Sequence, residues 1–217
     1  MGNEGHGRKR IHDGVIMRYV VRTVDFSTER RENVSLLKSI IPELEIVVDK
    51  TRNAYNGFFD ACRLINDTGG IILEDDILLC SNFQNRIESI INEKGTNEVL
   101  NFFEKPKSYF KTSYVGGSNF LWAQCIYLPP KLPNQISDMH DQFKIERPQK
   151  WQGQAVDCLI AYALTKLKRK YWRIRPCLVQ HLDFQSSIGN RPNNRQTPYF
   201  IDELEEKGID YDDLEFA

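Results

Sequence analysis

The chain of 217 residues lacks several features that would place it in a special class of protein. No apolar run approaches the roughly 20 residues that a membrane-spanning helix needs, and the polar N-terminus does not look like a signal peptide. The formal net charge is −1, so the charge balance gives no global argument for a nucleic-acid or membrane-surface partner. We therefore expect a cytoplasmic globular protein without a membrane span.

The cysteines also lack a disulfide or metal-binding pattern. The five cysteines are an odd number and contain no CxxC pair: Cys62, Cys80, Cys125, Cys158 and Cys177. Three of them lie inside apolar segments. This distribution favours buried free thiols in a reducing compartment and argues against a zinc site made of cysteines. Internal repeats are missing as well.

Strands and amphipathic helices alternate in the first half of the chain. The predicted elements are a strand over 19–24, a helix that ends at Pro42, a strand over 45–48, a helix over 53–65, a strand over 71–73 and a helix that begins near Phe83. Three such alternations within about 75 residues predict a parallel α/β sheet with right-handed crossovers.

The second half is less regular. Here we expect a glycine-bearing turn at 114–117, a strand over 120–128, a proline-rich surface loop over 129–152, a helix over 153–167 and a strand over 171–179. Loops as long as the proline-rich one are usually functional when they belong to a compact domain. The domain prediction is a flexible arm over 1–16, one α/β domain over 17–200 and an acidic tail over 201–217, either solvated or forming a docking helix.

The most informative stretch is Gly69–Ile77, where an apolar run ends in Glu74, Asp75 and Asp76. Ligands of open α/β sheets bind at the carboxyl ends of the strands. Three adjacent carboxylates repel one another, and a divalent cation offsets their charge well. The stretch therefore predicts a metal site, and a charged, solvated turn is the alternative.

A second motif follows the last predicted strand, which ends at His181 and leads into Ser186, Ser187 and Gly189. A neutral imidazole can join carboxylates as a metal ligand. Hydroxyl groups and backbone N–H groups of the glycine-bearing turn can bind phosphate oxygens. Taken alone, His181 is more often a structural histidine; combined with the acids, it indicates a metal–phosphate site.

Together the two motifs resemble those of nucleotide-sugar-dependent glycosyltransferases of the GT-A fold. The closest similarity is to the N-acetylglucosaminyltransferase IV-like group, whose C-terminal segment reads QHxGxxSS, and small viral and bacterial GT-A enzymes are similar in size and layout. The resemblance covers residues 17–190, with Asp183 in place of the glycine. It implies a Rossmann-like single domain with a mixed, mostly parallel sheet flanked by helices. It also implies that the donor is a nucleotide diphosphate sugar, with UDP as the expected carrier, and that the cofactor is Mn²⁺ or Mg²⁺.

The resemblance also implies residue roles. Asp76 and His181 are expected to hold the metal, and Glu74 contacts the metal or the donor ribose. The donor-binding candidates are Arg22, Thr23, Val24, Asp49, Asn53, Asp75, Ser186 and Ser187, with Arg30 and Arg31 as candidates for the diphosphate. For the residues at the strand ends, an ordinary solvent-facing turn is an equally good interpretation.

An inverting transferase needs a general base that deprotonates the acceptor hydroxyl. Asp157 is the candidate, although a carboxylate in the first turn of a helix also stabilises the helix dipole. Trp151 is the candidate for stacking on an acceptor sugar, with plain packing as the alternative. The sequence leaves the acceptor open among a glycan, a protein and a modified DNA base.

Two other functions remain open. A metal-dependent phosphohydrolase or nuclease would also use Glu74, Asp75 and Asp76, but it needs acids from further strand ends. A non-catalytic nucleotide-sugar-binding module would keep the pocket without turnover.

Overall fold

The structure, a computed structural model, describes residues 17–51, 53–105, 111–146, 156–184 and 195–209. In chain order its elements are β1 (Arg18–Val24), α1 (Thr28–Ile40), β2 (Glu45–Asp49), α2 (Ala54–Ile65), β3 (Gly70–Glu74), β4 (Ile77–Leu79), α3 (Phe83–Lys94), β5 (Leu100–Asn101), β6 (Ser113–Gly116), the 3₁₀ turn η1 (Gly117–Asn119), β7 (Cys125–Leu128), α4 (Leu132–Asp138), α5 (His140–Glu146), α6 (Val156–Lys166), β8 (Lys170–Arg173), β9 (Val179–His181) and α7 (Ile201–Glu206).

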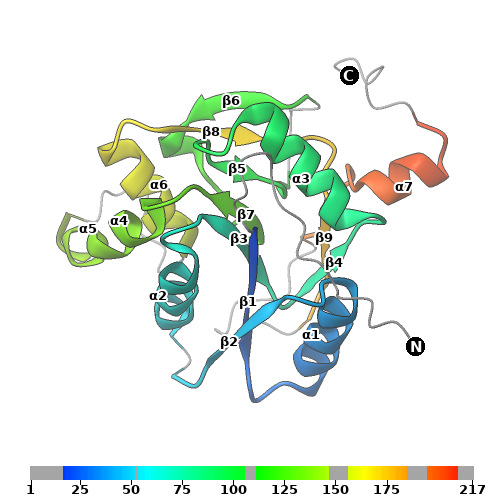
Figure 1. The fold of residues 1–217 in the computed structure, drawn as a ribbon, viewed down its shortest axis with the longest axis horizontal. Helices are drawn as coiled ribbons and strands as arrows, with labels where there is room; N and C mark the ends of the chain where they lie inside the picture. The colour runs from blue at the N-terminus through cyan, green and yellow to red at the C-terminus, as the bar shows by residue number, and fades with distance from the viewer. Residues whose placement is uncertain (1–16, 52, 106–110, 147–155, 185–194, 210–217) are drawn as a thin grey trace, which may run out of the picture.

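A central sheet of seven strands carries helices on both faces (Figure 1). The strand order is β2-β1-β3-β7-β5-β8-β6, and all strands except β7 and β6 run in one direction. The predicted fold class, a Rossmann-like mixed sheet flanked by helices in a single domain, is confirmed.

Each face of the sheet has its own hydrophobic core, because side chains alternate along each strand. Tyr19 and Val21 of β1 belong to the core under α1, α3 and α7. Val20 belongs to the second core, under α2, α4, α5 and α6. A strand buried on both faces reads as a nearly continuous apolar run, which is why β1 was visible in the sequence.

The first three strands lie next to one another and in parallel. Val24 of β1 pairs with Asp49 of β2, and Arg22 pairs with Glu74 of β3. The carboxyl ends of these strands therefore meet at one edge of the sheet. This register brings the acidic stretch beside the ends of β1 and β2.

The helices of the first half begin and end where the sequence predicts. Ser27 caps α1 by accepting a hydrogen bond from the Arg30 backbone N–H at 3.4 Å, and Asn53 caps α2 through the Tyr55 N–H at 3.1 Å. Such caps satisfy backbone donors that have no partner inside the helix. The spacing of Val34, Leu37, Ile40 and Ile41 predicts one apolar face for α1; three of these residues are buried, whereas Ile40 is exposed.

The predicted surface loop over 129–152 is wrong for its described part. Residues 132–138 and 140–146 form α4 and α5, and Leu132, Ile136 and Phe143 are buried. Proline is favoured at the start of a helix, because the missing N–H is not needed there, and Pro133 occupies such a position in α4.

Two predicted strands have other bounds in the structure. The strand over 120–128 begins only at Cys125. The strand over 171–179 is two strands in different sheets: β8 remains in the central sheet, while β9 pairs antiparallel with β4. The turn expected at 114–117 is largely strand β6.

Three further predictions concern the cysteines, the C-terminal segment and membrane-spanning helices. All five cysteines are free thiols, and four of them are buried. The described part of the segment 201–217 begins with α7, whose Ile201 and Leu204 are buried in the core. Among the described residues, none of the helices has the length and apolar character that crossing a membrane requires.

Candidate functional site

The acid turn, which we define as residues 74–76, lies at the carboxyl edge of the sheet between β3 and β4. Asp75 and Asp76 are buried there, although both carry carboxylates. Burial of an ionised carboxylate is costly unless a positive group or a metal accompanies it. The turn is therefore not the solvated turn of the alternative interpretation.

Arg30 of α1 supplies a positive group to both aspartates. Its guanidinium forms ion pairs with Asp75 Oδ1 and, at 2.9 Å, with Asp76 Oδ2, and the arginine is 4% exposed. Burial raises the pKa of Asp76, and Arg30 opposes that rise. Although burial lowers the pKa of Arg30, Asp76 and Asp75 raise it above its usual value. Arg30, expected to bind the diphosphate, thus contacts the acid turn itself.

Asn33, one turn further along α1, fixes the backbone of the acid turn. Its side-chain amide donates to the Asp75 carbonyl at 2.8 Å and to the Ile77 carbonyl at 2.9 Å. Both carbonyls lie where β3 gives way to β4. Asn33 therefore holds the turn whose carboxylates Arg30 pairs with.

Glu74 points to a different partner. Its Oε1 accepts from Arg22 Nη2 of β1 at 2.6 Å, and Arg22 Nη1 donates to the Ala54 carbonyl at the start of α2. Burial raises the pKa of Glu74, and Arg22 opposes the rise. The structure thus joins the two predicted residues Arg22 and Glu74 and places this pair beside the Asp75–Arg30–Asp76 cluster.

His181 reaches the acid turn because β9 pairs with β4, with Ile77 opposite His181. Its Nε2 lies 3.6 Å from Asp76 Oδ2, and the residue is 3% exposed. Burial, with a contribution from Arg195, lowers the pKa of His181 to about 4. The imidazole is therefore neutral at physiological pH, the form that binds a metal or accepts a hydrogen bond.

Several buried polar atoms at the turn have no hydrogen-bond partner within the described ranges. They are Asp75 Oδ2, Asp76 Oδ1, His181 Nδ1 and His181 Nε2. Such atoms are rare in native proteins and commonly mark a ligand or ion site. In the same part of the chain, however, no three His, Cys, Asp or Glu side chains form a group that could hold a metal ion by themselves.

Asp157 lies near this site, in the first turn of α6. Its Oδ2 accepts from the Trp122 backbone N–H at 3.5 Å, and its Oδ1 accepts from the Cys158 N–H at 3.0 Å. Burial raises the pKa of Asp157, while these hydrogen bonds and the charge of Arg22 oppose the rise. Two residues after Trp122, the Gln124 carbonyl accepts from the Glu74 N–H, so one short segment connects the candidate base to the acid turn.

The other predicted donor-binding residues differ in how exposed they are. Thr23, Val24 and Asp49 end β1 and β2 at the same edge and are buried. Asp49 Oδ1 accepts from the backbone N–H and the hydroxyl of Thr51, at 2.7 and 2.6 Å, while Asn53 caps α2 and is exposed.

Arg31 of α1 is exposed and donates to Thr28 Oγ1 at 3.2 Å. Its role at the diphosphate stays a prediction. Trp151, Ser186 and Ser187 lie outside the described residues.

Sequence reasoning missed the residues just before β7. Because β7 runs antiparallel to β3, the Gln124 carbonyl accepts from the Glu74 N–H at 2.9 Å. Gln124 is 6% exposed, and its Oε1 has no hydrogen-bond partner within the described segments. Trp122 has a backbone φ of 66°, which few residues other than glycine adopt. No sequence signal marks these two residues, because both lie inside a mostly apolar run that is typical of a strand.

A second buried charge cluster lies on β8 and its continuation. Glu104 Oε2 pairs with Arg173 Nε at 2.5 Å and lies 3.7 Å from Arg175 Nη2, and Glu104 Oε1 accepts from Tyr171 at 3.0 Å. All four residues are buried. Buried pairs of this kind are costly to break from one side, so this cluster fixes the end of β8.

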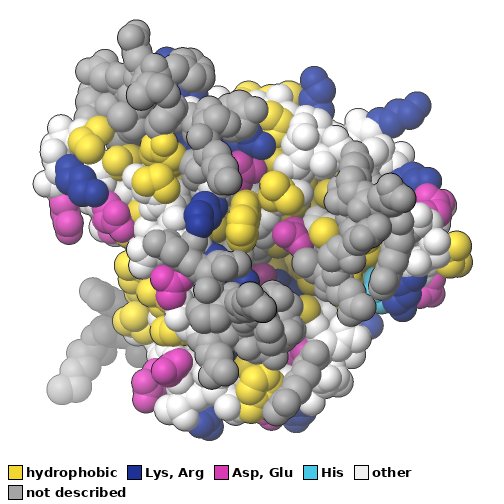
Figure 2. Space-filling view, turned by 180° about the vertical axis from the view of Figure 1, so that it is seen from behind, with side chains coloured by type: hydrophobic (Ala, Val, Ile, Leu, Met, Phe, Trp, Pro, Cys, Tyr) yellow, Lys and Arg dark blue, Asp and Glu magenta, His cyan; other side chains and the backbone are white. Residues whose placement is uncertain are grey.

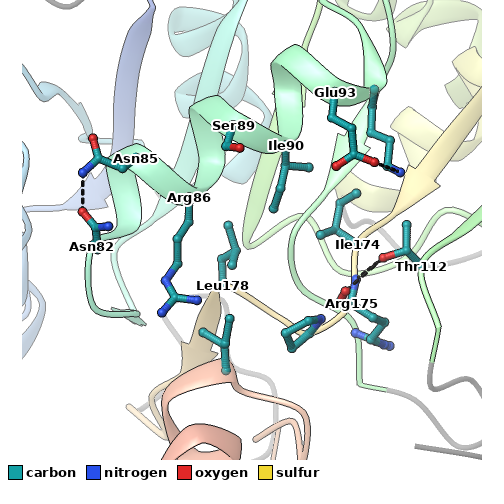
Figure 3. A pocket seen from close by; sticks show the side chains of 13 residues that line it. Asn82, Asn85, Arg86, Ser89, Ile90, Glu93, Thr112, Ile174, Arg175 and Leu178 are labelled. Atoms are coloured by element: carbon teal, nitrogen blue, oxygen red, sulfur yellow. Dashed lines mark hydrogen bonds and ion pairs between the residues drawn. The ribbon is translucent and has the colours of Figure 1, made fainter. Parts of the chain in front are cut away.

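A cavity of about 490 Å³ lies between α3, the β8–β9 connection and α7 (Figure 3). Arg86 and Ile90 project into it from α3, opposite Ile174 and Leu178. Arg86 also pairs with Glu205, at 2.8 Å. None of the predicted site residues that the structure describes lines this cavity, which is therefore distinct from the acid turn.

The surface seen from behind in Figure 2 carries basic, acidic and apolar side chains in small interspersed groups wherever residues are described. This pattern agrees with the formal net charge of −1. It gives no support to a broad electrostatic surface for nucleic acid.

Comparisons with known proteins give little further information. No protein-family model matches the chain, and no curated protein matches it. One solved structure, the crystal structure of A197 from STIV, is similar at a TM-score of 0.43 and 13% sequence identity, covering 79% of this chain and 87% of that one. A similarity this distant adds nothing about the site.

Proposed function

We propose that this protein transfers a sugar from a nucleotide diphosphate donor to an acceptor hydroxyl. The observation that carries the proposal is the acid turn. Two buried aspartates at a strand end face a neutral histidine from a strand far away in sequence, and polar atoms of all three residues have no partner among the described residues. A carboxylate of raised pKa lies nearby in Asp157.

A divalent cation fits this site with Asp76 and His181 as its protein ligands. Mg²⁺ is commonly bound through one or two protein carboxylates together with substrate phosphates, so a site with few protein ligands suits a diphosphate substrate. Such a cation would stabilise the negative charge that develops on the leaving diphosphate. The orphaned Asp76 Oδ1 and His181 Nε2 support this assignment.

The chain's own residues have separate tasks in this proposal. Arg30 supplies the positive partner of the two aspartates in a buried turn, and Asn33 fixes the turn's backbone. Asp157 accepts the proton of the acceptor hydroxyl, and its raised pKa makes it a stronger base than an ordinary carboxylate. Arg22 holds Glu74 through an ion pair at 2.6 Å.

The phosphohydrolase alternative finds less support. It needs acids from further strand ends, and Asp25 and Asp183 are exposed, while Asp49 is occupied by Thr51. In the described part of the chain, no three acidic side chains form a group that could hold a metal ion.

The binding-module alternative has one observation in its favour. Arg30 already neutralises the aspartates, so the turn has a positive partner without any metal. A module of this kind would bind a nucleotide sugar without turning it over.

A thermal-shift panel tests the proposal. UDP-, GDP- and TDP-sugars are added with and without Mn²⁺, and we expect at least one to raise the Tm in a Mn²⁺-dependent manner, because a ligand that binds only the folded state stabilises it. Asp76→Asn should abolish the metal dependence, whereas Asp60→Asn, on the exposed face of α2, should not change it. A panel without any stabilising donor contradicts the proposal. Donor binding without Mn²⁺ dependence and without sugar release favours the binding module.

A further inference from the structure

Trp122 lies between the two halves of the proposed site. Its backbone N–H contacts Asp157 Oδ2, and two residues later the Gln124 carbonyl accepts from the Glu74 N–H of the acid turn. The Trp122 ring packs edge-on against Phe103, with centroids 6.4 Å apart and planes at 85°. The Phe103 ring lies 6.4 Å from the His181 ring.

The backbone at Trp122 is strained. Its φ of 66° is left-handed, and a bulky side chain in that region is a true outlier that persists only where the surroundings enforce it. Asn101 supplies that enforcement: its fully buried side chain donates to the Leu121 carbonyl at 2.8 Å and accepts from the Phe103 N–H at 3.2 Å. The Asn101 side chain thus holds both Leu121, the residue before Trp122, and Phe103, whose ring packs against the Trp122 ring.

The ring is only partly covered. Trp122 is partly buried against the core, whereas its neighbours Phe120 and Ala123 are fully buried. Packing against Phe103 accounts for the buried part of Trp122, but it does not account for a strained backbone at a partly exposed tryptophan beside a candidate base. Strain of this kind collects at ligand sites.

We propose that Trp122 is the platform on which the transferred sugar of the donor stacks. This inference rests on the proposed function. In that reaction the diphosphate lies at the acid turn and the acceptor hydroxyl at Asp157, so the donor sugar must lie between them, where Trp122 is. The apolar face of a pyranose packs well on an indole ring. Gln124, whose buried Oε1 has no partner among the residues that the structure describes, accepts a hydrogen bond from a hydroxyl of the same sugar.

The first experiment compares a nucleotide with its sugar conjugate by calorimetry. The probes are UDP and the UDP-sugar that most stabilises the wild-type protein. For Trp122→Asn, which tolerates a left-handed backbone and keeps the N–H that contacts Asp157, we expect UDP to bind as before and the UDP-sugar to bind about tenfold more weakly. Leu121→Ala, at the exposed neighbour, is the matched control and should change neither affinity.

A second measurement does not depend on the folding of that variant. The chain has three tryptophans, so Trp151→Phe combined with Trp172→Phe leaves Trp122 as the sole indole. Its fluorescence should change on addition of the UDP-sugar and remain unchanged with UDP alone.

Three outcomes of the measurements on the variants would overturn the inference. One is an equal loss of UDP and UDP-sugar affinity in Trp122→Asn, another is unchanged UDP-sugar affinity, and the third is a fluorescence signal insensitive to the sugar. A wild-type protein that binds UDP with no gain from the sugar overturns the platform and leaves the nucleotide site intact. A wild-type protein that binds neither UDP nor any UDP-sugar removes the proposed function for UDP donors, and the platform falls with it.

Discussion

Replacement of Arg30 by methionine should destabilise the protein strongly. Methionine fills the apolar volume of the arginine stem but leaves Asp75 and Asp76 buried without their positive partner. Removal of one side of a buried ion pair costs about 3 to 5 kcal/mol. For a domain of this size we expect a loss of about 6 to 20 °C in Tm, measured by calorimetry or circular dichroism.

The loss should depend on pH in a defined direction. Burial already raises the pKa of Asp76, and Arg30 opposes that rise, so the variant's Asp76 has a higher pKa than in the wild type. A carboxylate whose folded pKa lies above its unfolded value of about 3.9 weakens the folded state as the pH rises above that value. The difference between variant and wild type should therefore be largest at neutral pH and shrink as the pH falls towards about 4.

Two further variants decide whether charge is the cause. Arg63→Met removes an exposed ion pair with Asp60 and should cost less than about 1 kcal/mol. Adding Asp75→Asn and Asp76→Asn to Arg30→Met removes the uncompensated charges and should restore part of the lost stability. An Arg30→Met protein as stable as the Arg63→Met control, or a loss that stays constant between pH 4 and pH 8, would refute this reasoning.

Two other predictions concern the site. Asp157→Asn should retain donor binding and lose turnover by about 100-fold or more. Because burial raises the pKa of Asp157, the wild-type rate should begin to fall with decreasing pH at a pH above the usual carboxylate range. A pH–rate profile of the wild-type protein checks this. Asn33→Ala removes both hydrogen bonds to the acid turn and should lower the free energy of unfolding, measured in urea, by about 1 to 3 kcal/mol. Ser39→Ala, at an exposed position of the same helix, should have little effect. Equal stability of the two variants would contradict the role of Asn33.

Much of the fold follows from local patterns in the sequence. β1 and β3 were predictable because strands buried inside a parallel sheet are apolar runs separated by amphipathic helices. The edge strand β2 was also visible as a short apolar run between two helices, although its Ile46 and Val48 are exposed. The bounds of β9 were not, because its alternation of side chains continues that of β8. Only the pairing of Ile77 with His181 shows that the chain leaves the central sheet between them.

The site was predictable to a similar extent. Glu74, Asp75 and Asp76 stand out as a run of acids after an apolar strand, and His181 follows as the end of another. The pairing of Arg30 with the aspartates is harder to predict, because an arginine in the first turn of an amphipathic helix is usually solvated. Trp122 and Gln124 carry no sequence signal, since a backbone φ and the burial of one amide are set by tertiary packing.

The pairing of β4 with β9 also has a consequence for how the protein is made. The acid turn and His181 are separated by about 100 residues. Closing a loop of that length lowers the conformational entropy of the chain, and only the contacts of the complete sheet offset this loss. A ribosome has to synthesise nearly the whole domain before the second side of the site exists. Chains interrupted before residue 179 would contain every acid of the turn and still lack the strand that completes it.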